Sequence, residues 1–130
     1  MDFSVEIKEE IIIAKIIIRR ATFLESLQFQ NLLTNEIDKG YIRAIIDLSN
    51  TASIDPAFFS SIIVIYKKLI NAGGNVKLIR PVNYLDDYEK FKNNLRVFEF
   101  FNSIEEAVES YRMIFTNPVD TLYPISTISG

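Results

Sequence analysis

Residues 44–79, AIIDLSNTASIDPAFFSSIIVIYKKLINAGGNVKLI, decide the fold of this chain. They begin with an apolar, β-branched run that predicts a buried strand, and a polar loop follows it. Asp55 and Pro56 are typical of a helix N-cap and a first helical residue, and the glycines at 73–74 are typical of a helix end. Asn75–Arg80 then predicts a short strand. A strand, a helix and a strand in this order predict two parallel strands joined by a right-handed crossover.

The rest of the chain continues this alternation of strands and helices. Thr22 with Glu25, and Ser103 with Glu106, have the spacing of a capping box, so each pair predicts the start of a helix. The expected elements, in chain order, are strands Phe3–Lys8 and Ile11–Ile18, a helix from Thr22 to Gly40, strand Tyr41–Leu48, a helix from Asp55 to Gly73, strand Asn75–Arg80, a helix over Tyr84–Lys92, a short edge strand Arg96–Phe101 and a helix from Ser103.

This order of elements predicts an α/β fold with one domain over residues 1–115. We expect a mixed, mostly parallel sheet of four to five strands, about four helices and an opening β-hairpin. Residues 116–130 are expected to form an irregular C-terminal tail, because Pro118 and Pro124 interrupt a segment with several serines and threonines.

Helical spacing also predicts which side chains face the core. In the first helix these are the apolar residues Leu24, Leu27, Leu32, Leu33 and Ile37. In the second helix they are Phe59, Ile62, Ile63, Tyr66, Leu69 and Ile70. A second stripe of the second helix consists mainly of small residues: Ala57, Ser60, Ser61, Val64 and Lys68. This stripe is a solvent face, a contact with a neighbouring helix, or a surface that another protein can approach closely, and the residues alone leave these interpretations open.

Composition limits the chemistry that the chain can perform. The 130 residues include no cysteine and no histidine, which removes thiol nucleophiles, thiolate metal sites and the most common general base. Fourteen basic and seventeen acidic side chains give a net charge of −3, which does not favour nucleic acid or an anionic membrane as a partner. We therefore expect a cytoplasmic protein that is not an enzyme and holds no metal or cofactor.

A few charged positions were still candidates for a site. Asp47 lies at the carboxyl end of a predicted strand, where open α/β sheets bind ligands, but we interpret it as an organiser of the loop. Asp55 is interpreted as a helix cap, and Asp86 and Asp87 lie in a later predicted helix. The adjacent arginines at 19–20 are interpreted as exposed charges at the end of a strand rather than contacts to a phosphate or an acidic partner.

Four segments, taken together, resemble the STAS domain family, which includes the bacterial anti-sigma factor antagonists. They are Ile45-Ile46-Asp47-Leu48-Ser49, Ser53-Ile54-Asp55, Ala72-Gly73-Gly74 before the next strand, and the closing stretch Phe98–Ala107. The resemblance covers roughly Phe3 to Phe115 and implies the α/β fold already expected from the pattern of elements. It also implies a regulatory protein that binds a kinase-like anti-sigma factor or a similar serine kinase-like regulator.

The resemblance further implies where the partner binds and how binding is controlled. Many antagonists carry a phosphorylatable serine two residues after the aspartate, and here that position is Ala57, so we expect this chain to lack the usual phospho-switch. The residues expected to bind the partner are Asp55, Pro56, Ala57, Phe58, Ser60, Ser61 and Val64. A relocated phosphorylation site is the alternative, at Ser53, Ser60 or Ser61.

Three further hypotheses stay open. One is an accessory STAS subunit of a membrane transporter, as some members of the family are. Another is a small-molecule-binding or weakly catalytic domain that uses Asp47, Asp55 and a serine or tyrosine, and it predicts a deep polar pocket at the carboxyl edge of the sheet. Self-association to a homodimer is the third, because the predicted strand Phe3–Lys8 offers a free edge.

Overall fold

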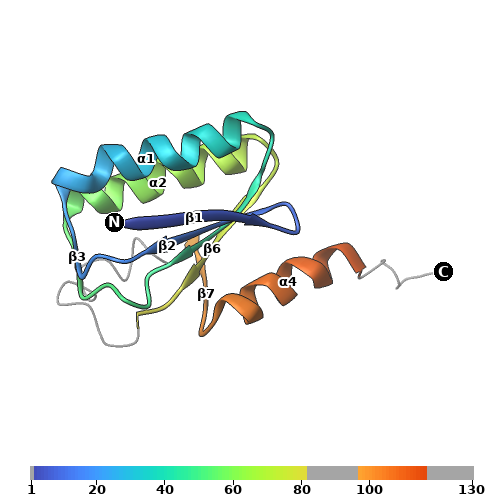
Figure 1. Ribbon diagram of the computed structural model, residues 1–130. Helices are drawn as coiled ribbons and strands as arrows, with labels where there is room; N and C mark the ends of the chain where they lie inside the picture. Colours follow the sequence, from blue (N-terminus) through green and yellow to red (C-terminus); the bar gives the residue numbers. More distant parts are fainter. Residues whose placement is uncertain (1, 82–96, 117–130) are drawn as a thin grey trace.

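Within the residues that the structure describes, a mixed five-stranded sheet lies between a layer of two helices and one helix on the opposite face (Figure 1). The computed structural model describes residues 2–81 and 97–116, and the elements below lie within them. The strands are β1 (Phe3–Lys8), β2 (Ile11–Ile16), β3 (Arg20–Ala21), β4 (Arg43–Asp47), β5 (Ser53–Ile54), β6 (Asn75–Ile79) and β7 (Glu99–Phe101). The helices are α1 (Phe23–Asp38), α2 (Pro56–Asn71) and α4 (Ile104–Thr116).

The sheet has the order β1-β2-β4-β6-β7. β1 and β2 form the antiparallel hairpin, and the pairs β2–β4, β4–β6 and β6–β7 are parallel. The predicted α/β fold with an opening hairpin and a mostly parallel sheet is therefore confirmed. Among the described residues no helix is long and apolar enough to cross a membrane.

The apolar strands are buried because both faces of the sheet are covered. In β2, Ile12 and Ile16 face the α1–α2 layer, whereas Ile11 and Ile13 face α4. This period of two is the ordinary consequence of the pleat. It explains why the run is apolar at nearly every position instead of alternating between apolar and polar.

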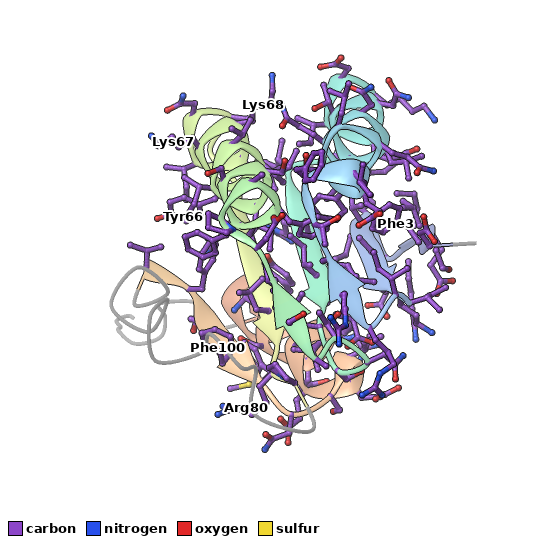
Figure 2. The ribbon with its side chains drawn as sticks, turned by 90° about the vertical axis from the view of Figure 1, so that its left-hand side faces the viewer. Phe3, Tyr66, Lys67, Lys68, Arg80 and Phe100 are labelled. Carbon is purple, nitrogen blue, oxygen red and sulfur yellow. The ribbon has the colours of Figure 1, made fainter. Side chains whose placement is uncertain are left out.

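The layer formed by α1 and α2 packs on the sheet through aromatic rings. Phe58 lies with its ring centroid 5.0 Å from that of Phe29 and 6.1 Å from that of Phe3. At the far side of α2, the Tyr66 ring meets Phe98 edge-on at 5.1 Å. Figure 2 shows Lys67 and Lys68 on the outer side of α2, away from this packing.

The turn between α2 and β6 requires both of its glycines. Gly73 directly follows Ala72, the C-cap residue of α2, and has a φ of +88°, a conformation that favours glycine. At Gly74 a Cβ atom would lie only 1.6 Å from the carbonyl oxygen of Ile42, so the close approach of the two chain segments excludes any side chain there. The predicted helix end at this glycine pair is thus confirmed.

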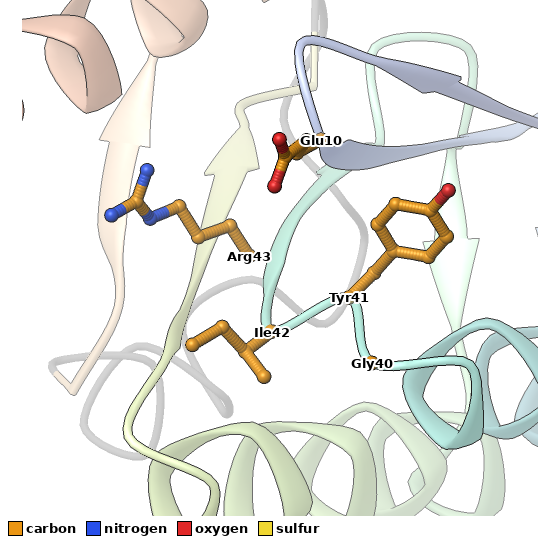
Figure 3. A pocket seen from close by; sticks show the side chains of 5 residues that line it. All are labelled: Glu10, Gly40, Tyr41, Ile42 and Arg43. Atoms are coloured by element: carbon orange, nitrogen blue, oxygen red, sulfur yellow. The ribbon is translucent and has the colours of Figure 1, made fainter.

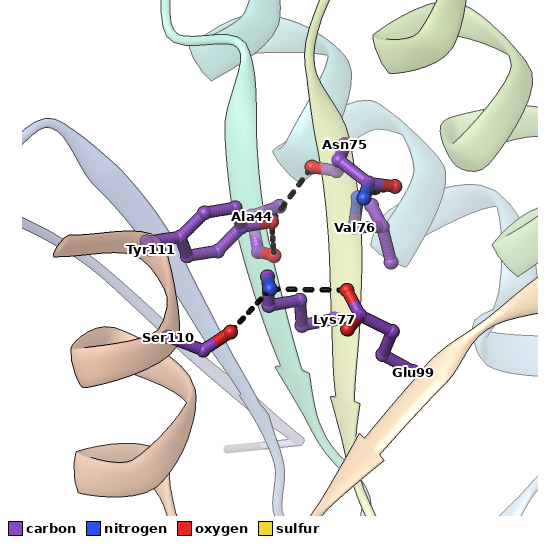
Figure 4. A network of polar contacts seen from close by, with 7 residues as sticks. All are labelled: Ala44, Asn75, Val76, Lys77, Glu99, Ser110 and Tyr111. Atoms are coloured by element: carbon purple, nitrogen blue, oxygen red, sulfur yellow. Dashed lines mark hydrogen bonds and ion pairs between the residues drawn. The ribbon is translucent and has the colours of Figure 1, made fainter. Parts of the chain in front are cut away.

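The face beneath α4 contains buried isoleucines and also buried polar groups, which Figure 4 shows. The Tyr111 hydroxyl lies 2.9 Å from the carbonyl oxygen of Ala44 and 3.0 Å from that of Asn75, and burial raises the pKa of this tyrosine. Beside it, the buried Lys77 ammonium group lies 2.6 Å from the Ser110 hydroxyl and 3.0 Å from a carboxylate oxygen of Glu99. α4 is therefore positioned by directional hydrogen bonds in addition to apolar contact.

The β1–β2 hairpin is also tied to α4. Glu9 and Glu10 both have positive φ, 52° and 65°, a conformation that costs energy for residues other than glycine. The Glu9 carboxylate accepts a hydrogen bond of 2.8 Å from Nε of Arg112, and this bond lowers the pKa of Glu9. The ion pair offsets part of the cost of this turn while both side chains stay partly exposed.

Several predicted boundaries and faces were wrong. β2 ends at Ile16, not at residue 18, and β4 starts at Arg43, not at residue 41. Within α1, Leu24 and Leu27 are exposed, Phe29 is buried although it was not predicted to face the core, and Leu33 is buried as predicted. On α2, Ile70 is exposed as well, because the helix contacts both the sheet and α1 and its buried face is turned toward them.

Other predictions lie partly or wholly outside the described residues. The helix over Tyr84–Lys92 and the pair Asp86 and Asp87 belong to this group. The edge strand is found as Glu99–Phe101, and Arg96, its predicted first residue, is not among the described residues. Of the predicted tail 116–130, Thr116 is the last residue of α4, and residues 117–130 are not described.

Candidate protein-binding surface

The starts of α1 and α2 are held side by side at the carboxyl edge of the sheet by a small backbone ladder. β3 and β5 form a parallel pair in which Arg20 is opposite Ser53. The carbonyl oxygen of Arg19 accepts hydrogen bonds from the amides of Ala52 and Ser53, at 2.7 and 3.1 Å. The Asp55 amide donates to the carbonyl oxygen of Ala21 at 2.9 Å. This ladder was not predicted, because each strand is only two residues long and too short to show a pattern in the sequence.

Asp55 caps both helices. One carboxylate oxygen accepts a hydrogen bond from the amide of Phe58 within α2, and the other accepts one from the amide of Phe23 at the start of α1, each at 2.8 Å. The first bond confirms the predicted N-cap. The second bond is between segments 32 residues apart and was not predicted. It fixes the two helix starts relative to each other.

Around this cap, the residues expected to bind a partner divide into an exposed and a buried group. Pro56, Ala57, Ser60 and Val64 are exposed on the outer side of α2. Asp55 is half-buried, and its carboxylate makes the two hydrogen bonds described above. Phe58 and Ser61 are buried and face the sheet or α1. The exposed members thus form a surface of small side chains, and the buried members hold it in place.

The three serines considered for a relocated phosphorylation site have different environments. Ser60 is exposed on α2, and Ser53 is half-buried in β5. The Ser61 hydroxyl lies between the helices, 3.2 Å from the carbonyl oxygen of Ser26 and 3.3 Å from the side-chain oxygen of Gln30. For Ser61, the contact with a neighbouring helix is therefore the interpretation that the structure favours.

Asp47 lies at the end of β4, as expected, and it organises the loop. Its carboxylate accepts a hydrogen bond of 2.9 Å from the amide of Ser49 and is largely buried. This Asx turn fits the interpretation of Asp47 as a residue that organises the loop. No group of three or more acidic side chains placed to hold a metal ion occurs among the described residues.

Three exposed apolar residues near this surface were missed by the sequence analysis. Phe23, Leu24 and Leu27 occupy the first turns of α1 and keep 65%, 74% and 66% of their surface exposed. Helical spacing had placed the two leucines in the core. A signal was present, because Phe29 lies one turn before Leu33, a predicted core residue, but which residues of the first turns join that stripe depends on how the helix is turned on the sheet.

A small pocket lies at the opposite, amino edge of the parallel strands (Figure 3). It is lined by Glu10 and by residues 40–43, and its volume is about 210 Å³. This is below the roughly 300–1,000 Å³ of ordinary small-molecule sites. The alternative of a small-molecule-binding domain predicted a deep polar pocket at the other edge, around Asp47 and Asp55, and this pocket does not lie there.

Comparisons with known proteins bear on the fold. No protein-family model matches the chain, and no curated protein sequence matches it. Among solved structures, a candidate anti-sigma factor antagonist from Thermotoga maritima aligns over 85% of this chain and 94% of its own, with a TM-score of 0.73 and 24% identity. A STAS-domain anti-sigma factor antagonist protein from Planctomyces limnophilus covers 84% of this chain and 96% of its own, with a TM-score of 0.72 and 15% identity.

The phosphorylated form of SpoIIAA, a Bacillus cell fate determinant, is similar over 85% of this chain and 99% of its own. Its TM-score is 0.70 at 16% identity, and SpoIIAA is also known in an unphosphorylated form, described as an anti-sigma factor antagonist. The order of strands and helices in this chain and the similarity to these three proteins lead to one conclusion. The chain has the STAS fold of the anti-sigma factor antagonists.

Proposed function

We propose that this protein is a non-enzymatic regulatory module that binds a kinase-like anti-sigma factor through the start of α2. The proposed contact residues are the exposed Pro56, Ala57, Ser60 and Val64, with Asp55 at their edge. Phe58 and Ser61 support this surface from beneath. The observation that carries the proposal is this rigidly capped surface of small side chains, placed on a fold shared with anti-sigma factor antagonists.

Small exposed side chains suit a protein contact because they let a partner approach the backbone of α2 closely. The surface does not need to reorganise on binding, since Asp55 fixes the starts of both helices. A pre-formed surface loses less conformational entropy on association than a mobile one.

We further propose that binding is not controlled by phosphorylation at the position where related proteins carry a serine. Ala57 occupies that position and has no hydroxyl group. A phosphate would add about −1.5 to −2 charges. It would weaken binding because it repels acidic groups of the partner and because burying it in the contact costs desolvation energy. Without an acceptor the surface stays competent to bind. Of the three serines considered for a relocated switch, Ser60 is the most exposed. Ser53 is half-buried, and Ser61 is buried and hydrogen-bonded.

The experiment combines binding with intact-mass measurement. The full chain is titrated with a purified kinase-like anti-sigma factor encoded beside its gene, and both proteins are then incubated with ATP. We expect the wild-type chain to bind and to gain no phosphate, and the Ala57→Ser variant to gain one. Ala57→Glu should weaken binding at least tenfold by placing a charge in the contact.

One result would contradict the proposed partner class, and another would contradict the proposed loss of the phospho-switch. Failure of the wild-type chain to bind any such factor, while remaining folded by circular dichroism, would remove the proposed partner class. Phosphorylation of the wild-type chain would remove the proposed loss of the switch, and a Ser60→Ala variant would then show whether the phosphate lies on Ser60.

A further inference from the structure

The start of α1 carries an apolar patch that the fold itself does not use. Phe23, Leu24 and Leu27 lie within two helical turns and are each about two-thirds exposed or more. Single exposed apolar residues are common in soluble proteins, but three neighbours within two turns of a helix indicate a contact surface. The core contacts of α1 are made by other residues, chiefly Phe29 and Leu33.

The patch lies beside the surface proposed to bind the partner. The amide of Phe23 is hydrogen-bonded to Asp55, the cap of α2, and Figure 1 shows both helices starting at the same end of the molecule next to β3. Ser26, one turn after Phe23, contacts Ser61 of α2 through its carbonyl oxygen. One partner can therefore cover both helix starts at once.

The charges at the margin of the patch are unequal. Arg19 and Arg20 precede the helix and are exposed, and in the described part of the chain neither side chain has an ion pair or a hydrogen bond. The two nearby carboxylates are already occupied, since Glu25 accepts hydrogen bonds from Thr22 and Asp55 accepts them from two amides. Both carboxylates keep their negative charge, but they are half-buried and turned toward these donors, so the exposed charges at this margin are those of the two arginines.

We propose that this patch, defined as Phe23, Leu24 and Leu27 with Arg19 and Arg20, binds an amphipathic segment of the protein partner that carries apolar side chains bordered by carboxylates. The proposal rests on the proposed function, because the same partner covers the start of α2. The apolar side chains supply the buried area, and the arginines select acidic over basic segments.

A direct test uses two designed helical peptides as probes. Both have a leucine face, and the margins of that face carry glutamates in one peptide and lysines in the other. Each is titrated into the isotope-labelled full chain while the amide NMR signals are recorded. We expect the glutamate peptide to shift the signals of residues 19–28, with an affinity that falls as salt is added.

Variants separate the apolar and the charged contributions. Leu24→Gln combined with Leu27→Gln should lower the affinity for the glutamate peptide roughly tenfold or more. Arg19→Glu combined with Arg20→Glu should reverse the preference toward the lysine peptide. Met113→Gln, an exposed apolar position on α4 at the opposite face, is the matched control and should change neither affinity. Circular dichroism checks that each variant is folded.

Three outcomes would overturn the proposal: equal binding of both peptides, shifts confined to other parts of the chain, or no shifts at all. A concentration-dependent shift of the same signals without any peptide would also overturn it, because a second copy of the chain would then be the occupant. The peptide test needs no anti-sigma factor. Failure of that factor to bind the wild-type chain would therefore contradict the proposed function separately from the chemistry of the patch.

Discussion

The sheet face beneath α1 and α2 is packed by apolar side chains, whereas the face beneath α4 also holds a buried lysine and a buried tyrosine hydroxyl. The first face has two helices and a cluster of aromatic rings, so non-directional burial holds the helices on the sheet, and hydrogen bonds of Asp55 and Ser61 join the helices to each other. In the described part of the chain the second face is covered by one helix, α4. Directional hydrogen bonds from Tyr111 and Lys77 then fix where that helix lies.

The largest expected effect concerns the aromatic cluster. Phe58→Ala removes a fully buried ring that contacts Phe3 and Phe29, and it should lower the free energy of unfolding by about 3–5 kcal/mol. Urea unfolding followed by circular dichroism measures it. Phe23→Ala, at an exposed ring, is the control and should change stability by less than about 0.5 kcal/mol. Similar losses for both variants would show that the aromatic face does not depend on burial.

On the opposite face, Tyr111→Phe tests the role of directional bonds. The ring is kept, but the carbonyl oxygens of Ala44 and Asn75 lose a buried donor, so we expect a loss of about 1–2 kcal/mol. Hydrogen exchange should show faster opening of α4 than of α2 in this variant. An unchanged stability and an unchanged exchange of α4 would mean that apolar contact alone positions the helix.

The pair formed by Lys77 and Glu99 is tested by comparing the stability losses of two variants. Glu99→Ala leaves the buried ammonium group without its carboxylate partner, and we expect a cost of about 1–2 kcal/mol, reduced from that of a fully buried pair because Glu99 is largely exposed. Lys77→Met replaces the buried charge with an apolar chain of similar length and should be nearly neutral. Denaturant unfolding of both variants gives the order, and the reverse order would contradict this account of the second face.

The smallest effect is expected at the ion pair between the hairpin and α4. The pKa of Glu9 is lowered in the folded state, so its contribution to stability is present above its unfolded pKa of about 4.5 and is lost as the pH falls through the lower folded value. Glu9→Gln should remove a small part of the acid dependence between about pH 5 and 3. Thermal unfolding across this range measures it, with Glu6→Gln on the neighbouring strand as control. An identical acid dependence in wild type and Glu9→Gln would show that the pair does not stabilise the fold.

Much of the fold was predictable because its signals are local. The capping box of Thr22 and Glu25, the Asp55 cap followed by Pro56, and the glycine turn at 73–74 each depend on neighbours within a few residues. The wrong assignments concern faces: Leu24, Leu27 and Ile70 were expected in the core and are exposed. Helical spacing gives the stripes of a helix, but it does not say which stripe meets the sheet and which meets another helix.

The sequence by itself determined the order of the five strands of the main sheet and of α1, α2 and α4, the N-caps of α1 and α2 and the absence of a hydroxyl at Ala57, because these are properties of single residues and short patterns. Only the tertiary structure decided that Asp55 caps α1 as well as α2, that β3 pairs with β5, and that the start of α1 keeps its apolar side chains outside the core. Each of these depends on segments about 30 residues apart meeting at one edge of the sheet. That meeting is set by the packing of both helices on the same face, which no local pattern specifies.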